Sequence, residues 1–221
     1  MEGREELDMA LTMNIVPKSV VFCPSYVSVD EVLQRYGEEI EILSVSKSLF
    51  DALAYQKVPG NYMAIFASWT HNLEKMKPGG TTVILEGIEK PGNLGAIIRT
   101  CEAAGVENIL VTEADIDLFN PNVIRNSRGS FFNVNTAFCS NDEAMNWVKK
   151  HGISIYATSI AENSVDFRSI ADSDRKAFVF GPESSGLSDY WLKGSTVVTI
   201  PMHGSVDSLN LSVSVGIVLF Q

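Results

Sequence analysis

Three polar loops in the part of the chain from residue 80 to residue 221 carry residues that could do chemistry, and the first of them spans residues 89–95. Pro91 and Gly92 shape a strand-to-helix turn there, and Asn93 is a residue type that caps helices by accepting a hydrogen bond from an orphan N–H group. Arg99 follows on a mostly apolar helix, and arginine is rarely buried without a partner. We therefore expect Arg99 either to form a structural ion pair or to contact an anionic substrate.

The second polar loop, residues 180–188, directly follows an apolar run that predicts a strand at residues 177–180. The carboxyl edge of an open α/β sheet is where ligands bind, and glycines such as Gly181 allow a backbone to approach a ligand closely. The loop contains neither the Gly-Lys-Ser/Thr of a phosphate-binding loop nor Gly-x-Gly-x-x-Gly, which disfavours nucleoside triphosphate and dinucleotide sites. Outside a ligand site, Glu183 would cap a short helix at residues 188–192 or be solvated.

Polar residues recur at every second position where the last helix begins, as Ser208, Asn210 and Ser212. N-capping explains one polar residue at a helix start but not three. His203 lies in the same loop, and a lone histidine beside a glycine is more often solvated than catalytic. Ser208, His203 and Asp207 are close in sequence, but their spacing alone does not support a Ser-His-Asp triad.

Short β-branched runs alternate with helical stretches, which predicts an α/β fold with a largely parallel sheet. Pro and Gly at residues 75–80 stop both helix and strand and mark a linker, so we predict two domains, residues 1–75 and 80–221. The chain starts abruptly in a helical pattern and stops in mid-helix at Gln221, so we expect both ends to be shortened. We predict strands at residues 19–23, 40–45, 62–67, 82–85, 108–111, 153–157, 177–180 and 197–200, and helices at residues 5–13, 29–36, 48–54, 94–104, 142–150 and 209–220.

The composition narrows the class of protein. The 221 residues include 17 Lys and Arg against 27 Asp and Glu, and a net charge of −10 speaks against a protein that coats nucleic acid. Residues 118–141, however, contain no acid and carry Arg125 and Arg128. The three cysteines lie far apart without a Cys-x-x-Cys pair, which predicts reduced thiols and no metal site. An acidic start and only short apolar runs predict a cytoplasmic protein with no membrane association.

The order of the three loops resembles the SpoU/TrmH family of RNA ribose 2′-O-methyltransferases, within the SPOUT class. The first family motif is similar to Asn-x-Gly-x-x-x-Arg-Thr at residues 93–100, and the second to Gly-x-Glu-x-x-Gly-Leu at residues 181–187. The third is similar to Ile-Pro-Met at residues 200–202 followed by Asp-Ser-Leu-Asn-x-Ser-Val at residues 207–213. The stretch at residues 122–130 also resembles the Ser-rich segment between the first two motifs.

The resemblance implies an α/β domain of the SPOUT type with a deep trefoil knot at its C-terminal end, binding S-adenosylmethionine. Members act as homodimers through the knot region. The first domain resembles a small α/β substrate-binding domain related to a ribosomal RNA-binding protein family, here without its first strand. The implied cofactor-binding residues are Thr158, Gly181, Ile200, Met202 and Leu209, and the implied catalytic residues are Asn93, Arg99, Glu183, Ser208 and Asn210.

The chemistry that the resemblance implies is methylation of a ribose 2′-hydroxyl in RNA. An arginine normally stays protonated, so we favour a role for Arg99 in stabilising the developing alkoxide and a phosphate over a role as base. Arg125 and Arg128 are our candidates for phosphate contacts. Ribosomal RNA is favoured over transfer RNA because of the extra first domain, which is an argument by analogy.

Three other interpretations remain open. Transfer RNA could be the substrate of the same reaction. The chain could be a non-catalytic RNA-binding relative, although intact Asn93, Arg99, Glu183, Ser208 and Asn210 tell against that. A dehydrogenase or another phosphate-binding α/β protein is disfavoured because the glycine fingerprints are absent.

Overall fold

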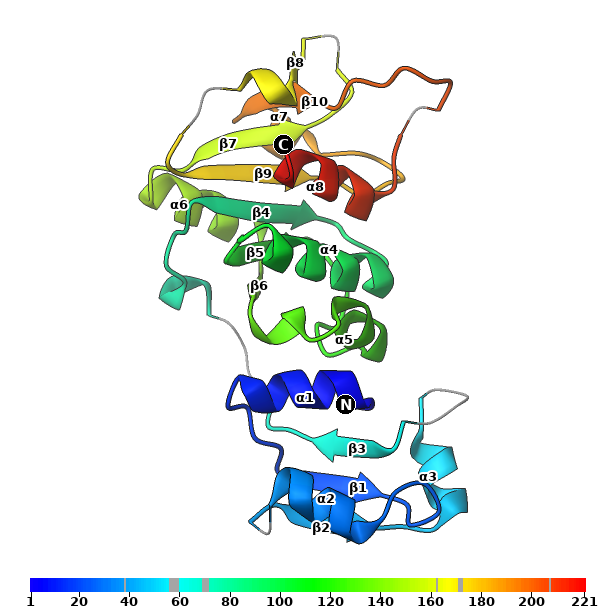
Figure 1. Cartoon of the computed structure of the whole chain (residues 1–221). Coiled ribbons are helices and arrows are strands. Elements are labelled where there is room, and N and C mark those ends of the chain that lie inside the picture. Colours follow the sequence, from blue (N-terminus) through cyan, green and yellow to red (C-terminus); the bar gives the residue numbers. More distant parts are fainter. Residues whose placement is uncertain (38, 56–59, 69–71, 162, 171–172, 207) are drawn as a thin grey trace. The chain divides into compact units, whose positions relative to one another are not determined.

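The computed structural model describes residues 1–37, 39–55, 60–68, 72–161, 163–170, 173–206 and 208–221. The chain forms two compact units, Met1–Trp69 and Thr70–Gln221 (Figure 1). Residues 73–76, which the sequence placed at the first domain's end and in the linker, belong to the second unit, where Met76 is buried in the core and Leu73 packs against it.

The first unit is a three-stranded sheet with the strand order β2-β1-β3. Strand β1 is buried along its whole length, pairs in parallel with β2 and pairs antiparallel with β3. Serine caps set the starts of two helices: Ser28 accepts a hydrogen bond from the Glu31 N–H at 3.2 Å, and Ser46 accepts one from the Leu49 N–H at 3.3 Å. The elements are α1 (Arg4–Thr12), β1 (Ser19–Phe22), α2 (Val29–Tyr36), β2 (Glu41–Ser44), α3 (Lys47–Leu53) and β3 (Tyr62–Ile65).

The second unit is built on a seven-stranded sheet with the order β6-β5-β4-β9-β7-β10-β8, and neighbouring strands in its described part pair in parallel. The parallel α/β sheet predicted from the sequence is therefore confirmed. Its strands are β4 (Thr81–Glu86), β5 (Asn108–Thr112), β6 (Asn135–Cys139), β7 (Ser154–Thr158), β8 (Val165–Asp166), β9 (Lys176–Phe180) and β10 (Thr196–Thr199).

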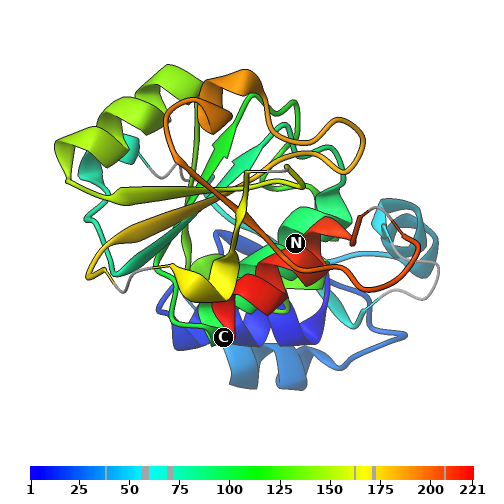
Figure 2. The same ribbon diagram turned by 90° about the horizontal axis from the view of Figure 1, so that it is seen from above.

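Helices cover both faces of this sheet, with α6 and α7 on one face and α4 and α8 on the other (Figure 2). Strands β4, β5 and β9 are almost wholly buried, as expected for parallel strands between two helical layers. The helices are α4 (Pro91–Ala103), α5 (Pro121–Ser127), α6 (Asn141–Lys150), α7 (Asp189–Leu192) and α8 (Leu211–Leu219), with 3₁₀ turns η1 (Leu73–Lys75), η2 (Ser130–Phe132) and η3 (Phe167–Ser169).

Helix α4 makes the contacts that place the first polar loop. It packs against both α5 and α8. Its close approach to α5 depends on Gly95, because a Cβ atom there would lie 2.5 Å from the Val123 carbonyl oxygen and 2.8 Å from the Asn126 Cβ. No helix among the described residues is long and apolar enough to cross a membrane. The trefoil knot implied by the resemblance stays a prediction.

Candidate active site

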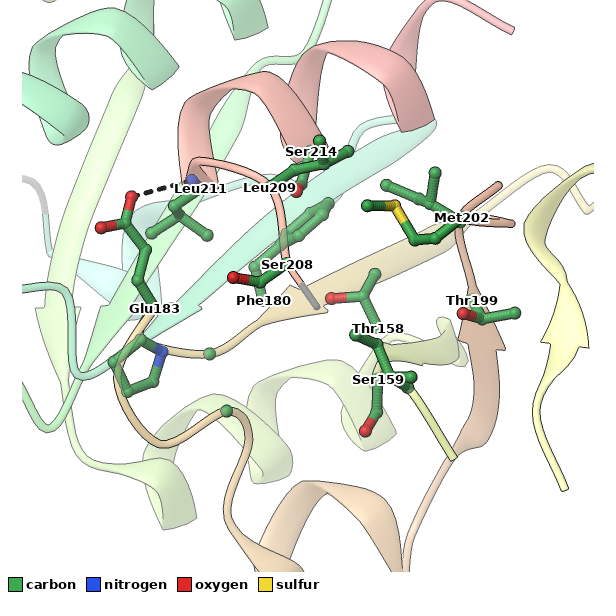
Figure 3. Close-up of a pocket in the computed structure, with 15 residues that line it drawn as sticks. Thr158, Ser159, Phe180, Glu183, Thr199, Met202, Ser208, Leu209, Leu211 and Ser214 are labelled. Atoms are coloured by element: carbon green, nitrogen blue, oxygen red, sulfur yellow. Dashed lines mark hydrogen bonds between the residues drawn. The ribbon is translucent and has the colours of Figure 1, made fainter. Parts of the chain in front are cut away.

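A cavity of about 320 Å³ lies where β7, β9 and β10 end at the carboxyl edge of the sheet (Figure 3). Its walls combine apolar side chains, such as Phe180 and Met202, with hydroxyl groups, such as those of Thr158 and Ser208. The volume is within the range of small-molecule sites, roughly 300–1,000 Å³. The lining residues are Thr158, Ser159, Ile160, Phe180, Gly181, Pro182, Glu183, Gly186, Thr199, Ile200, Met202, Ser208, Leu209, Leu211 and Ser214.

All five residues proposed from the sequence to bind a cofactor line this one cavity. They come from four places in the chain: the end of β7, the loop after β9, the end of β10 and the segment before α8. The structure thus brings them together at one cavity.

Gly181 is required at the cavity wall because the chain folds back against it. A Cβ atom at this position would lie 2.4 Å from the Gly186 carbonyl carbon and 2.4 Å from the Leu187 nitrogen. Both are backbone atoms, so any larger residue would displace the loop between Gly181 and Leu187. The glycine therefore allows the loop to close on itself beside the cavity.

Glu183 is the centre of a hydrogen-bond network at one end of the cavity. Its Oε1 accepts hydrogen bonds from Asn93 Nδ2 at 3.1 Å, Asn210 Nδ2 at 2.7 Å and the Leu211 N–H at 3.1 Å. Its Oε2 accepts a hydrogen bond from Lys90 Nζ at 2.6 Å. The hydrogen bond from Lys90 and, after it, the Leu211 N–H hold the pKa of the Glu183 carboxyl below its usual value, so the group is ionised at neutral pH.

Neither alternative role for Glu183 outside a ligand site is correct. Its side chain is only 27% exposed, and both carboxylate oxygens accept hydrogen bonds from protein groups, so it is not simply solvated. The carboxylate at the start of α7 is that of Glu86, which accepts hydrogen bonds from the Ser188 N–H at 2.8 Å and the Ser188 hydroxyl at 2.6 Å. Glu86 also accepts one from Asn141 Nδ2 at 2.8 Å and is buried.

Asn93 does not cap its helix, contrary to the structural interpretation of the first loop. Helix α4 starts at Pro91, which suits the first helical position because its missing N–H group is one that the helix leaves unpaired. Asn93 therefore lies inside the first turn, and its amide is free to donate to Glu183 and to accept from Asn210 Nδ2 at 3.3 Å.

The three alternating polar residues at the start of α8 each have a distinct position: Ser208 precedes the helix, Asn210 is its N-cap and Ser212 lies in its first turn. Asn210 is the N-cap, and its Oδ1 accepts hydrogen bonds from the Ser212 N–H at 3.0 Å and the Ser212 hydroxyl at 2.6 Å. Its Nδ2 points the other way, to Glu183. Ser208 lines the cavity. One helix start thus supplies a cap, a partner for Glu183 and a cavity wall.

Arg99 lies apart from this network. It is exposed on α4, six residues beyond Asn93, which is about 9 Å along a helix axis. Among the described residues its side chain has no hydrogen bond or ion pair, so the structural ion pair considered from the sequence is not formed there. The structure of the single chain brings Asn93, Glu183, Ser208 and Asn210 together but not Arg99.

Arg125 and Arg128 belong to α5 and its C-cap, an element that the sequence reading missed. Both are exposed, and Arg128 has a left-handed backbone conformation with φ of 48°. The signal that could have revealed α5 is Asn120 followed by Pro121, an N-cap and a first-turn proline. Because α5 packs on α4, both arginines are carried by the helix that contacts the one bearing Asn93 and Arg99.

Lys90 is a residue of the site that neither loop composition nor the motifs predicted. It lines a second cavity of about 180 Å³ with Ile88, Glu89, Asn93, Pro182, Glu183, Ser184 and Leu211. Glu183 borders both cavities. The pairing joins residues 93 positions apart, and no local pattern signals such a contact.

Comparison with known proteins decides the family. The profile of the SpoU rRNA methylase family matches residues 80–220. The chain belongs to this family. A protein of Mycoplasma pneumoniae named as a tRNA/rRNA methyltransferase is 38% identical over 148 residues, covering 65% of this chain and 61% of that protein. The chain's match therefore spans about three fifths of the length of that relative.

Two further relatives of this SpoU-family chain differ in their RNA. A tRNA (guanosine(18)-2′-O)-methyltransferase of Thermus thermophilus is 34% identical over 143 residues, covering 63% of this chain and 72% of the enzyme. The crystal structure of an AdoMet-bound rRNA methyltransferase from Sinorhizobium meliloti matches with a TM-score of 0.86 at 30% identity, covering 100% of this chain and 84% of that one. Within the described residues, no group of three or more His, Cys, Asp or Glu side chains is placed to hold a metal ion.

Proposed function

We propose that this protein transfers a methyl group from S-adenosylmethionine to a ribose 2′-hydroxyl of RNA. The observation that carries the proposal is the cavity at the strand ends, bordered by the network of Glu183, Asn93 and Asn210. These residues belong to three segments that match the motifs of the SpoU family, to which the chain belongs. The Thermus relative is named as a tRNA 2′-O-methyltransferase, and the Sinorhizobium enzyme, named as an rRNA methyltransferase, binds the same methyl donor in its crystal structure.

The cavity fits S-adenosylmethionine in size and in the character of its walls. Backbone groups of Gly181, Ile200 and Leu209 would hold the cofactor, with Thr158 and Met202 beside it. Leu209 and Met202 offer apolar surface to an aromatic ring, whereas Thr158 and the exposed backbone offer polar contacts. When bound, S-adenosylmethionine supplies a methyl group that its positively charged sulfur has already activated.

The chain's own residues then have two tasks, alignment and stabilisation of charge. The ionised Glu183, which lines the cavity, fixes the amides of Asn93 and Asn210 through hydrogen bonds to its Oε1. Arg99 stays protonated and stabilises the ribose oxygen as it loses its proton to solvent, or contacts the adjacent phosphate. We propose this role over that of a base. Arg125 and Arg128 are proposed phosphate contacts, carried by the helix that packs on α4.

A homodimer through α8 is the proposed assembly. Val213, Ile217 and Phe220 lie at positions i, i+4 and i+7 of the last helix and its C-cap and are 49%, 37% and 62% exposed. Three large apolar residues on one exposed helical face favour burial against another surface. Because α8 packs on α4 in the same unit, a partner on this face would lie near the helix that bears Arg99.

Ribosomal RNA is the proposed substrate, and transfer RNA is the alternative. The first unit favours ribosomal RNA by analogy with substrate-binding domains, and we propose it as the RNA-recognition domain. The Thermus relative, which acts on tRNA, keeps the alternative open.

The decisive experiment is methyl transfer from S-adenosylmethionine carrying a tritiated methyl group to unmodified transcripts of bacterial 23S rRNA and of tRNA. A methylated 2′-oxygen cannot attack the neighbouring phosphate, so alkaline hydrolysis leaves labelled dinucleotides. We expect such dinucleotides from the rRNA transcript.

Calorimetric titration with S-adenosylmethionine and with NAD separates the alternative functions. Binding of S-adenosylmethionine without transfer to either RNA would indicate a non-catalytic relative, and binding of NAD alone would indicate a dehydrogenase.

A further inference from the structure

Among the residues that the structure describes, Lys90 is the one that contacts Oε2 of Glu183. Oε1 accepts three N–H donors from three separate residues, whereas Oε2 accepts the ammonium of Lys90. A carboxylate held at one oxygen alone can rotate about that anchor. With both oxygens held, the plane of the carboxylate is fixed, and so are the two amides that donate to it.

The position of this ion pair distinguishes it from an ordinary surface pair. Asp189 on α7 and Lys193 at its C-cap are 79% and 77% exposed, and neither lines a cavity described above. In the pair of Lys90 and Glu183, by contrast, the carboxylate is 27% exposed and borders both cavities. Lys90 lines the smaller cavity with Asn93.

We propose that Lys90 is a positioning residue of the methyl-transfer site, whose ammonium fixes the Glu183 carboxylate so that the amides of Asn93 and Asn210 face the junction of the two cavities. This inference rests on the proposed function. Lys90 acts through Glu183, and its contribution to the reaction is to hold the donors of Asn93 and Asn210 in one arrangement while RNA binds.

The electrostatic surroundings of Glu183 support this role. The groups that face its carboxylate are Lys90 and Asn93 at the start of α4, and Asn210 and Leu211 at the start of α8. Among them only Lys90 is charged, and its hydrogen bond is the largest cause that lowers the pKa of Glu183. Glu183, and to a smaller extent the neighbouring Glu89, raise the pKa of Lys90 above its usual value.

Removal of the Lys90 charge is therefore expected to change the pKa of Glu183 in one direction. The pKa of Glu183 in the folded protein would rise toward its ordinary value, so the carboxylate would become protonated at a higher pH than in the parent chain. The proton would bind to Oε2, the oxygen that Lys90 no longer contacts, and the Oε1 of a neutral carboxyl accepts the three N–H donors more weakly than a carboxylate oxygen does. If the ionised form is the active one, the acidic limb of the pH–rate profile moves to higher pH.

The test compares three variants of the full chain. Lys90→Met removes the ammonium but keeps an unbranched stem of similar length, and Lys90→Arg restores a charged donor. Lys193→Met is the matched control, because it removes an ion pair of similar length, 2.7 Å, at a solvated position. For each we would measure kcat and KM for S-adenosylmethionine on a 23S rRNA transcript across the acidic pH range. We would also titrate the Glu183 carboxyl by ¹³C NMR.

The expected results separate positioning from mere packing. Lys90→Met lowers kcat by about fivefold with little change in KM, as expected for an interaction at the upper end for partly exposed ion pairs. It also raises both the carboxyl pKa and the pH of the acidic limb. Lys90→Arg recovers most of kcat, and Lys193→Met behaves as the parent. Parental kcat in Lys90→Met together with an unshifted Glu183 titration would overturn the proposal.

Failure of this inference can be told from failure of the proposed function. If the parent chain transfers no methyl group to RNA, the proposed function is refuted, and the role of Lys90 in that reaction is refuted with it. If the parent chain is active and Lys90→Met has the same kcat and the same Glu183 titration as the parent, the methyltransferase assignment stands and the proposed role of Lys90 is refuted.

Discussion

Substitution of Gly181 by alanine tests whether the loop beside the cavity is as tightly closed as the structure shows. The added Cβ would lie 2.4 Å from two backbone atoms and 2.7 Å from the Gly186 carbonyl oxygen. Carbon contacts are normally about 3.5–4.0 Å, so the loop must move by about 1 Å or more. Leu187 at the end of the loop is buried in the core of the second unit, so the movement cannot stay at the surface. Such overpacking costs about 1–3 kcal/mol.

The stability of the second unit can be followed by tryptophan fluorescence during urea unfolding. Trp147 and Trp191 are 5% and 0% exposed and both lie in the core cluster of that unit. We expect the Gly181→Ala transition at lower urea concentration with an unchanged slope. Because the loop forms part of the cavity wall, calorimetric titration should also show S-adenosylmethionine affinity reduced by about tenfold, equivalent to about 1.4 kcal/mol.

Gly204→Ala is the matched control. Its added Cβ would meet no atom within 4 Å, and the residue lies in the segment that leads from β10 to α8. Surface changes of this kind usually alter stability by less than about 0.5 kcal/mol. Parental stability and parental affinity in Gly181→Ala would refute the argument from close approach, whereas equal losses in both variants would show that the assay does not resolve the contact.

Three further predictions concern other parts of the second unit. Arg99→Lys keeps the positive charge but loses the planar fork, so we expect lower kcat in the RNA assay; retained activity would argue against a bidentate role. Glu86→Gln turns an amide N–H toward the donors of Ser188 and should destabilise the second unit by about 1–3 kcal/mol in urea unfolding. Ile217→Asp should convert the proposed dimer to a monomer in light scattering, and a parental mass would exclude the α8 face as the interface.

Strands of the second unit could be predicted closely where burial leaves a continuous apolar run. The expected strand at 177–180 differs from β9 by one residue, and the expected strand at 108–111 differs from β5 by one. Strand β6 was missed because Asn-Thr-Ala-Phe-Cys neither alternates nor forms an apolar run, and it lies at an edge of the sheet. Local composition carries little signal for such a strand.

The site could be predicted only as a set of separate segments. Loop composition and the motifs selected Asn93, Glu183 and Asn210, and the structure places these three in contact. Their bonding could not be predicted, because the first loop reads equally well as a helix cap. The structure contradicts the interpretation of Asn93 as a helix cap, because α4 starts at Pro91, two residues earlier. The side-chain amide of Asn93 is therefore available to bond Glu183.

The order of the strands explains why the three segments meet. The chain places β9 beside β4, although four strands separate them in sequence, and β10 lies two positions beyond β9. All of them end at one edge because the sheet is parallel, so the loops after the adjacent strands β4 and β9 lie next to each other.

The third segment starts farther away. The end of β10 is about 10 Å from that of β9 at the usual strand spacing. The segment from β10 to α8 must therefore return across the ends of β7 and β9 before Asn210 can reach Glu183 (Figure 1). The cavity is the space enclosed by this return, so its lining and the Glu183 network depend on the same strand order.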